Sequence, residues 1–157
     1  MTKLSILMHI QVGAQGICSV KVENTNNSRV EWCIQGDDQW NKEINAWMKT
    51  YAAGRQPEEG LMVDLSAQPF FTQCILDEMQ RIPFGQTLSY AGLARAVGKP
   101  KAARAVGNAC GRNPIPIIVP CHRVISSDGS IGGFSLDPSL KKNLLAFENV
   151  LGMEKAL

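Results

Sequence analysis

The chain has 157 residues, of which 45% are hydrophobic and 19% are charged, and its net charge is +2. No stretch reaches the ~18 apolar residues that a membrane-spanning helix needs, so we expect no membrane partner. The five cysteines are irregularly spaced and include no CxxC pair, which argues against a disulfide framework or a zinc cluster and favours a reducing, cytoplasmic compartment.

The first third of the sequence predicts antiparallel strands. Short apolar or alternating runs lie at residues 4–10, 16–22 and 29–34, and the polar segment NTNNS provides a turn between the last two. The first run is about as long as a signal-peptide core, but it lacks a small-residue cleavage site, so we interpret it as a strand. His9, Cys18 and Cys33 are conceivable metal ligands. Because they are not clustered, we expect core residues and no metal site.

A helix is predicted next, at residues 37–54, because apolar side chains recur there at helical spacing and Gly54 ends the run. These side chains are Trp40, Ile44, Trp47, Met48 and Tyr51. The loop RQPEEG follows, and we place the domain boundary near it. The predicted units are an N-terminal α/β lobe at residues 1–65 and a C-terminal domain at residues 66–157.

The C-terminal domain is predicted to be mainly helical. Its first helices are expected at residues 68–82, 89–98 and 101–111. The last two are short and are separated by a glycine-containing turn, which is the pattern of a helix-turn-helix.

Basic residues concentrate around this helix pair, since residues 81–123 contain seven basic residues and no acidic residue. The pattern fits either a solvated basic face or a surface for phosphates. The last helix of the pair carries Arg104 as its one long side chain among small residues. It is either a weakly packed surface helix or one built for close approach to another surface. The small residues are Ala102, Ala103, Ala105, Gly107 and Ala109.

The segment NPIPIIVPCHRVI (residues 113–125) predicts a constrained extended stretch that leads into a buried turn, because three prolines restrict its backbone. A lone buried cysteine such as Cys121 is usually inert packing. A reactive one needs a nearby base or cation. His122 is adjacent, but neighbouring side chains on an extended backbone point to opposite faces. Direct cooperation would therefore require a tight turn or a bridging water.

A final helix is predicted at residues 138–152, with Pro138 in its first turn. Its apolar stripe consists of Leu140, Leu144, Phe147 and Leu151. Glu148 borders this stripe, so it is either a surface-edge residue or a buried carboxylate that needs a partner. His122 and Arg123 both qualify. Cys121, His122 and Glu148 would then form a thiol-activating relay.

The run PCHRVI, with KAARAVGNACGRNPIPIIV before it and GSIGGFS and KNLLAFE after it, resembles the O6-alkylguanine-DNA alkyltransferase family over about residues 70–148. The resemblance implies an α/β (α+β) fold with a ribonuclease-H-like N-terminal lobe and a helix-turn-helix C-terminal domain. It also implies a monomeric, cytoplasmic DNA repair protein that needs no cofactor and binds double-stranded DNA in the minor groove. Such a protein flips out O6-alkylguanine, chiefly O6-methylguanine, and transfers the alkyl group once and irreversibly to Cys121.

The same resemblance assigns roles to individual residues. His122 is the base that reaches the thiol through a water, Glu148 orients it, and Asn113 supports this network. Arg104 fills the gap left by the flipped base. The base pocket is assigned to Tyr90, Phe134, Ser135 and the carbonyls of Cys121 and Val124. The DNA-binding helix contributes Lys101, Ala102, Ala103, Ala105 and Gly107.

Departures from the family pattern occur at the pocket rim. Leu136, Asp137 and Pro138 replace a flexible Gly-Gly pair, which predicts a stiffer rim, and Phe134 replaces the commoner tyrosine. Two alternative functions stay open at this point. One is a lesion-binding protein whose Cys121 is inactive, and the other is a cysteine hydrolase, which would need an oxyanion hole. We expect Arg123 to form a structural salt bridge.

Overall fold

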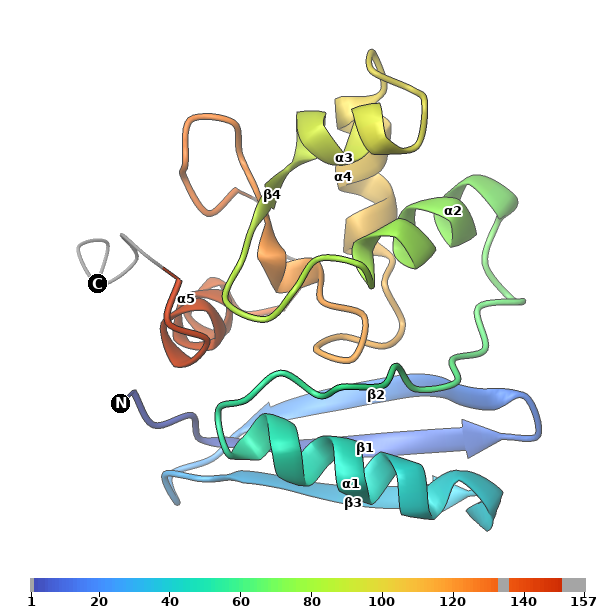
Figure 1. Cartoon of the computed structure of the whole chain (residues 1–157), viewed down its shortest axis with the longest axis vertical. Helices are drawn as coiled ribbons and strands as arrows, with labels where there is room; N and C mark the ends of the chain where they lie inside the picture. Colours follow the sequence, from blue (N-terminus) through green and yellow to red (C-terminus); the bar gives the residue numbers. More distant parts are fainter. Residues whose placement is uncertain (1, 133–135, 151–157) are drawn as a thin grey trace.

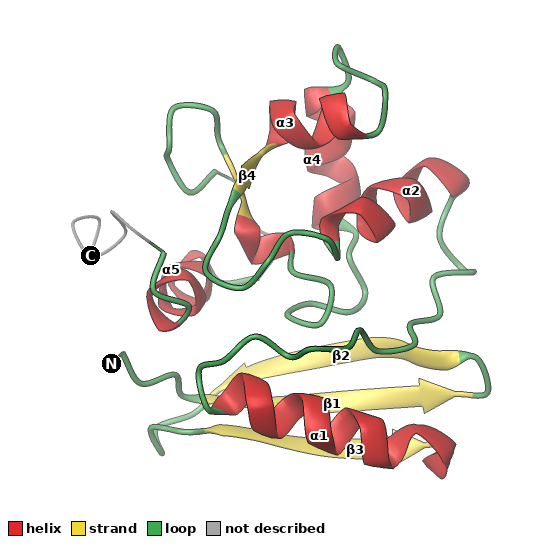
Figure 2. Ribbon diagram, in the orientation of Figure 1, coloured by secondary structure: helices red, strands yellow, loops and turns green. Residues whose placement is uncertain are grey.

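The computed structural model describes residues 2–132 and 136–150 and has a mixed α/β fold, as expected. Figures 1 and 2 show a three-stranded sheet and one helix in the lower part of the molecule and the remaining helices above them. The elements in chain order are β1 (Ile6–Gly13), β2 (Gly16–Asn24), β3 (Val30–Gly36), the 3₁₀ helix η1 (Asp38–Trp40), α1 (Asn41–Ala52), α2 (Phe70–Met79), β4 (Leu88–Ser89), α3 (Tyr90–Ala96), α4 (Ala103–Gly111), the 3₁₀ helix η2 (Cys121–Arg123), β5 (Val124–Ile125) and α5 (Pro138–Phe147).

The sheet has the strand order β2-β1-β3, in which β1 pairs antiparallel with β2 and parallel with β3. The expectation of a purely antiparallel set with a simple turn before β3 is therefore wrong. The connection from β2 crosses the start of β1, where Thr25 N donates to Ser5 O at 3.0 Å and Ile6 N donates to Arg29 O at 3.2 Å. Passing one strand requires about 10 Å, which five extended residues span easily.

One hydrophobic core joins the lower and upper parts of the molecule. Buried side chains of β1 alternate along the strand, as the period of two requires, and α1 buries Ile44, Met48 and Tyr51. These side chains belong to the same cluster as Ile75 of α2 and Leu144 of α5. The predicted boundary at residues 65 and 66 stays a prediction.

The segment between α1 and α2 is attached to the sheet at the start of β2. Ile17 N donates to Met62 O at 2.9 Å, and Asp64 N donates to Ile17 O at 2.7 Å. Gly16 has a φ of +122°, and a Cβ atom there would lie 2.5 Å from Met62 O. Only glycine permits this close approach of two backbones.

α3 and α4 form the expected helix-turn-helix. Ser89 caps α3, because its Oγ accepts from Gly92 N at 2.9 Å. α4 buries Val106, Ala109 and Cys110 and leaves Arg104 exposed. Val106, the larger apolar side chain of α4, therefore faces the core together with Ala109, and the other small residues remain for the outer face.

α5 begins as predicted, with Pro138 in the first turn. Asp137 is the N-cap, since its Oδ1 accepts from Ser139 N at 2.9 Å. The departure from the family pattern at residues 136–138 is thus a helix start. Of the predicted stripe, Leu140, Leu144 and Phe147 are buried, whereas Leu151 lies outside the described residues. No helix in the described ranges is long and apolar enough to cross a membrane.

Candidate active site

Cys121 lies in the turn η2, at the end of the proline-rich segment, and is 4% exposed. Cys121 N donates to Val119 O at 2.9 Å, and Arg123 N donates to Pro120 O at 3.0 Å. The expected buried turn is therefore present. Successive side chains of a 3₁₀ helix point in different directions, so the side chains of Cys121 and His122 leave the turn in different directions.

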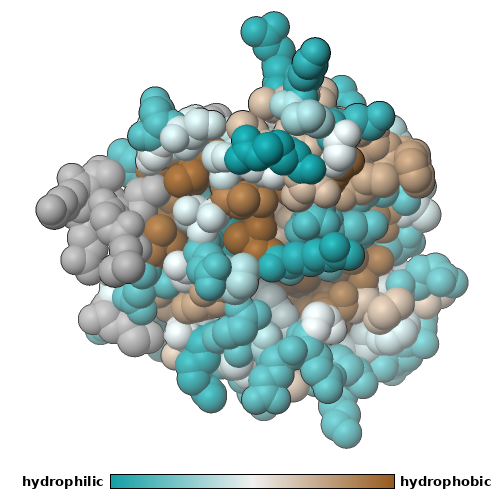
Figure 3. All heavy atoms as spheres, turned by 45° about the horizontal axis from the view of Figure 1, so that its top comes forward, coloured by the Kyte–Doolittle hydropathy of each residue, from teal (hydrophilic) through white to brown (hydrophobic). Residues whose placement is uncertain are grey.

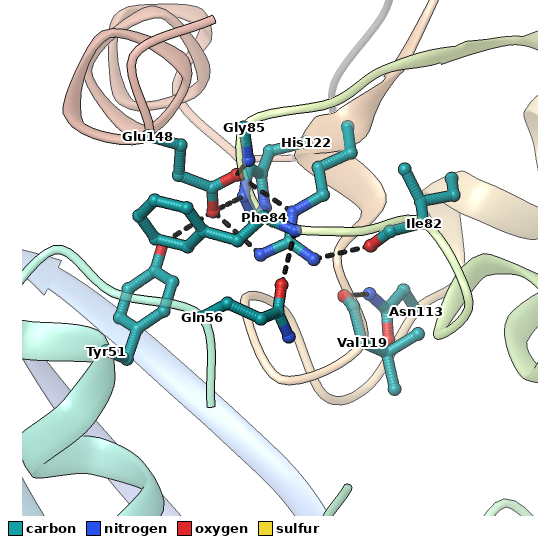
Figure 4. A network of polar contacts seen from close by, with 10 residues as sticks. Tyr51, Gln56, Ile82, Phe84, Gly85, Asn113, Val119, His122 and Glu148 are labelled. Carbon is teal, nitrogen blue, oxygen red and sulfur yellow. Dashed lines mark hydrogen bonds and ion pairs between the residues drawn. The ribbon is translucent and has the colours of Figure 1, made fainter. Parts of the chain in front are cut away.

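Glu148 accepts hydrogen bonds from several elements at the end of α5 (Figure 4). His122 Nε2 lies 2.7 Å from its Oε1, and Tyr51 Oη donates to the same oxygen at 2.9 Å. Arg123 donates through Nε to Oε2 at 2.8 Å and through an η nitrogen to Oε1 at 3.0 Å. Gly85 N also donates to Oε2, at 3.3 Å. Glu148 is 1% exposed, so the alternative of a surface-edge glutamate is wrong and both predicted partners bind it.

These contacts set the charge states of Glu148 and His122. Burial by itself would raise the pKa of Glu148, but His122 and Arg123 outweigh it and hold that pKa well below its usual range. Burial lowers the pKa of His122, against the opposing effect of Glu148. The imidazole is therefore neutral at pH 7, and its bond to the carboxylate assigns the proton to Nε2.

The other ring nitrogen of His122 carries the free lone pair. His122 is fully buried, and within the described part of the chain its Nδ1 has no hydrogen-bond partner. Buried nitrogens are usually paired, so an exception often marks a catalytic role. This nitrogen is therefore able to accept a proton.

Asn113 connects the end of the helix-turn-helix to the Cys121 turn. Its Nδ2 donates to Val119 O at 2.8 Å, and its Oδ1 accepts from Ile115 N at 2.9 Å. Burial raises the pKa of the Cys121 thiol, while a hydrogen bond with Asn113 and the positive charge of Lys141 lower it. The thiol therefore holds its proton at rest and must lose it as it reacts.

Lys141 is a site residue that the sequence analysis missed. It is fully buried on α5, its Nζ donates to Val124 O at 2.6 Å, and it lies 5.8 Å from the centre of the Tyr90 ring. Burial lowers its pKa to about 8, against the effect of Cys121 and Cys110. The burial of Lys141 could have been predicted from its position three residues before Leu144, because that spacing places both side chains on the same, buried side of the helix.

Tyr90 borders the same region from the start of α3. Burial raises its pKa to about 12, with smaller effects of Cys110 and Cys121, so the hydroxyl is a permanent donor at neutral pH. The loop before α5 packs against its ring. Gly132 has a φ of +73°, and a Cβ there would lie 2.9 Å from Tyr90 Cε2. The predicted pocket residues Phe134 and Ser135 lie outside the described residues.

The outer face of α4 adjoins this region. A Cβ at Gly107 would lie 3.8 Å from Tyr90 Cδ1. Lys101, Arg104 and Ala105 are exposed, and Ala102, Ala103 and Gly107 are half-buried. Figure 3 brings this end of the molecule forward and shows apolar residues exposed between hydrophilic side chains. The outer face of α4, which carries small residues, is thus accessible to a partner.

No group of three or more His, Cys, Asp or Glu side chains suited to a metal occurs in residues 2–132 and 136–150. His9, Cys18 and Cys33 are half-buried, so the expectation that they are core residues is wrong. Cys33 Sγ lies 3.2 Å from His9 Nδ1. His9 alternates with buried neighbours along β1 and pairs with Cys33 of β3, so both residues lie on the face of the sheet that turns away from the core.

Comparisons with known proteins agree with these features. Residues 70–150 match a family model described as 6-O-methylguanine DNA methyltransferase, DNA binding domain. The methylated-DNA–protein-cysteine methyltransferase of Mus musculus is 40% identical over 115 residues, which cover 69% of this chain and 54% of that protein. The constitutive enzyme of that name from Bacillus subtilis is 40% identical over 114 residues, which cover 72% of this chain and 68% of the relative.

The fold also has close relatives among solved structures. The Mycobacterium tuberculosis protein OGT, solved in complex with DNA, has a TM-score of 0.71 and 30% identity, and the match covers 93% of this chain and 97% of that one. An archaeal O6-methylguanine-DNA methyltransferase from Pyrococcus kodakaraensis shares the fold with a TM-score of 0.62 at 20% identity. The matched segment spans about half the length of the mammalian relatives.

Proposed function

This chain belongs to the 6-O-methylguanine DNA methyltransferase family, and we propose that it repairs DNA by direct reversal. It would accept the alkyl group of O6-alkylguanine, chiefly O6-methylguanine, on Cys121 in a single-turnover reaction. The observation that carries this proposal is the buried His122–Glu148 pair, which adjoins the buried Cys121 in the chain and leaves His122 Nδ1 without a partner among the described residues.

The proposed reaction is a displacement at the alkyl carbon. The Cys121 thiol gives its proton to His122 Nδ1, directly or through a water, and the sulfur forms a bond to that carbon as the carbon–O6 bond breaks. The guanine leaves as an anion, which the Tyr90 hydroxyl stabilises by donation. The Lys141 charge stabilises the thiolate as it forms, and Asn113 holds the turn. The product is a thioether on Cys121, and no group in the scheme restores the thiol.

The proposed substrate is a base flipped out of double-stranded DNA. O6 is buried in the base stack, so extrusion costs a few kcal/mol. We propose that α4 enters the minor groove, where its small residues permit a close approach, and that Arg104 occupies the space of the flipped base. The exposure of Arg104 beside the Tyr90 region supports this role. The DNA complex of the Mycobacterium tuberculosis relative supports the binding of DNA in general.

Lys101, Ala102, Ala103, Ala105 and Gly107 are proposed DNA contacts on the same helix. The assignments of Val124, Phe134 and Ser135 to the base pocket stay predictions. So do the monomeric state and the cytoplasmic location, although the cysteines in the described part of the chain are all free thiols, as a reducing compartment requires.

Mapping the acceptor tests this proposal. The protein is incubated with duplex DNA that carries O6-methylguanine labelled on the methyl carbon, and the labelled peptide is identified by mass spectrometry. We expect the label on Cys121 in the wild-type protein and none in Cys121→Ala. Cys110→Ala is the matched control, because Cys110 is also buried and close to the site, and it should keep the label. Label on any other residue, or none in the wild type, would overturn the proposal.

A further inference from the structure

The first helix of the molecule reaches the proposed catalytic pair through Tyr51. Its hydroxyl donates at 2.9 Å to Glu148 Oε1, across 97 positions of the sequence. The same oxygen is 2.7 Å from His122 Nε2. Tyr51 is fully buried on α1, and Figure 4 shows its hydroxyl directed at the carboxylate from the side opposite the turn. The N-terminal part of the chain therefore supplies a donor to the atom that binds the catalytic base.

Aromatic packing fixes the position of this hydroxyl. The Tyr51 ring stacks on the Trp47 ring, with the ring centres 5.3 Å apart. It meets the Phe84 ring edge-on, with the ring centres 5.8 Å apart. It also packs against Phe147 of α5, with the ring centres 5.6 Å apart. Burial and the nearby Glu148 carboxylate raise the pKa of Tyr51 well above its ordinary value. The hydroxyl thus remains protonated and donates from one fixed place.

The charges around His122 come from two elements, α5 and η2. Glu148 stands at the end of α5, Arg123 lies next to the histidine in η2, and Lys141 lies on α5. Glu148 divides its negative charge among five hydrogen bonds. Three of these bonds, from Tyr51, His122 and Arg123, share Oε1. Donors on one oxygen compete for the same electron density, because each bond polarises the acceptor. A stronger bond from Tyr51 to Oε1 therefore weakens the support that Oε1 gives to an imidazolium.

We propose that Tyr51 is a positioning residue that sets the basicity of His122 by sharing Glu148 Oε1 with it. Through this bond the N-terminal lobe keeps the imidazole neutral and ready to accept the Cys121 proton at physiological pH. The proposal rests on the proposed methyl transfer, and it gives the N-terminal lobe a role in that reaction.

The test is the pH profile of the transfer rate at saturating duplex, for the wild type and Tyr51→Phe, which removes one oxygen and keeps the ring. Without the competing donor, His122 holds its proton more strongly, so the fall in rate on the acid side should begin at higher pH. We expect the variant to be roughly threefold slower or more at acid pH, which corresponds to about half a pKa unit. Above pH 8 its rate should match the wild type within about twofold.

Two comparisons separate this role from simple packing. Trp47→Phe alters the same aromatic cluster without touching Glu148, and its profile should keep the wild-type midpoint. Incorporation of 3,5-difluorotyrosine at position 51 makes the hydroxyl a stronger donor and should move the acid limb to lower pH. The fluorinated variant keeps the shape of tyrosine, so it tests the proposal even if Tyr51→Phe does not fold.

The outcomes are distinguishable from those of the methyl transfer itself. Wild-type transfer to Cys121 decides the proposed function, whichever way the tyrosine variants behave. An acid limb that stays at the wild-type midpoint in both Tyr51 variants, or a loss of rate that is uniform over pH, would overturn the positioning role. The chain has two histidines, so NMR titration of His122, assigned with His9→Gln, reports the same shift independently of DNA.

Discussion

At the scale of single residues, Cys121 and His122 are neighbours in sequence with separate tasks. The thiol keeps its proton because burial raises its pKa, and the imidazole stays neutral because burial lowers its pKa. Neither group is charged at rest, so the proposed reaction requires the thiol to lose its proton during the transfer. Glu148 holds the imidazole in place and at the same time binds the Arg123 guanidinium.

Glu148→Gln tests that dependence. The substitution keeps the shape of the side chain but leaves the Arg123 guanidinium buried without a counter-ion, which should cost about 3–5 kcal/mol of unfolding free energy. Transfer should also slow by roughly a hundredfold, in the range that removal of a general-base contact produces. Urea unfolding and single-turnover transfer measure the two effects. Asp77→Asn, at an exposed carboxylate on α2, is the control, and equal behaviour of the two variants would contradict this role for Glu148.

At the scale of elements, α4 combines a buried apolar side with an outer face of small residues around Arg104. This helix, its partner α3 and the turn between them were predictable, because helical spacing and glycine punctuation are local signals. The strand β3 was also predicted, but its expected antiparallel pairing was wrong, since it pairs parallel with β1. Strand pairing across an intervening strand depends on tertiary contacts, and alternation alone does not encode it.

Arg104→Ala should therefore affect duplex and free-base substrates differently. The side chain is proposed to support the flipped state, so its loss should slow transfer from duplex DNA about tenfold or more, in keeping with an extrusion cost of a few kcal/mol. Reaction with free O6-benzylguanine, which needs no extrusion, should be unchanged. Arg112→Ala removes an exposed arginine at the other end of α4 and should leave both reactions near wild type. Equal losses with both substrates in Arg104→Ala would refute the assignment.

At the scale of the whole molecule, one hydrophobic core and one carboxylate join the two parts of the chain. The contact between His122 and Glu148 was predictable, because both residues lie within the segment that carries the family pattern. The part of Cys121 in a relay with them stays a prediction. The bond from Tyr51 was not predictable, since periodicity assigned that tyrosine only to the apolar side of a helix. A contact over 97 positions has no local signal, and Lys141 was missed because charge counting treats every lysine as exposed.

The buried pair also makes stability depend on pH. The pKa of His122 is lowered from its ordinary 6.5, so the unfolded chain binds a proton there before the folded protein does. The pKa of Glu148 is lowered from its ordinary 4.5, which adds stability above 4.5 that is lost as pH falls toward its folded value. Since stability rises with pH wherever the unfolded state holds more protons, we expect the unfolding free energy to be lost progressively below pH 6.5 and more steeply below pH 4.5. Urea unfolding between pH 4 and 8 checks this, and a flat profile would contradict the neutral state of His122.

The most direct measurement of the central claim is the stoichiometry of transfer. Duplex DNA with labelled O6-methylguanine is added in excess to the wild-type protein, and protein-bound label is followed to its plateau together with the amount of repaired guanine. The account predicts a plateau at one methyl group per protein molecule, equal to the guanine released, and no further repair afterwards. Repair that continues beyond one equivalent, or tight lesion binding with no label on the protein, would contradict it.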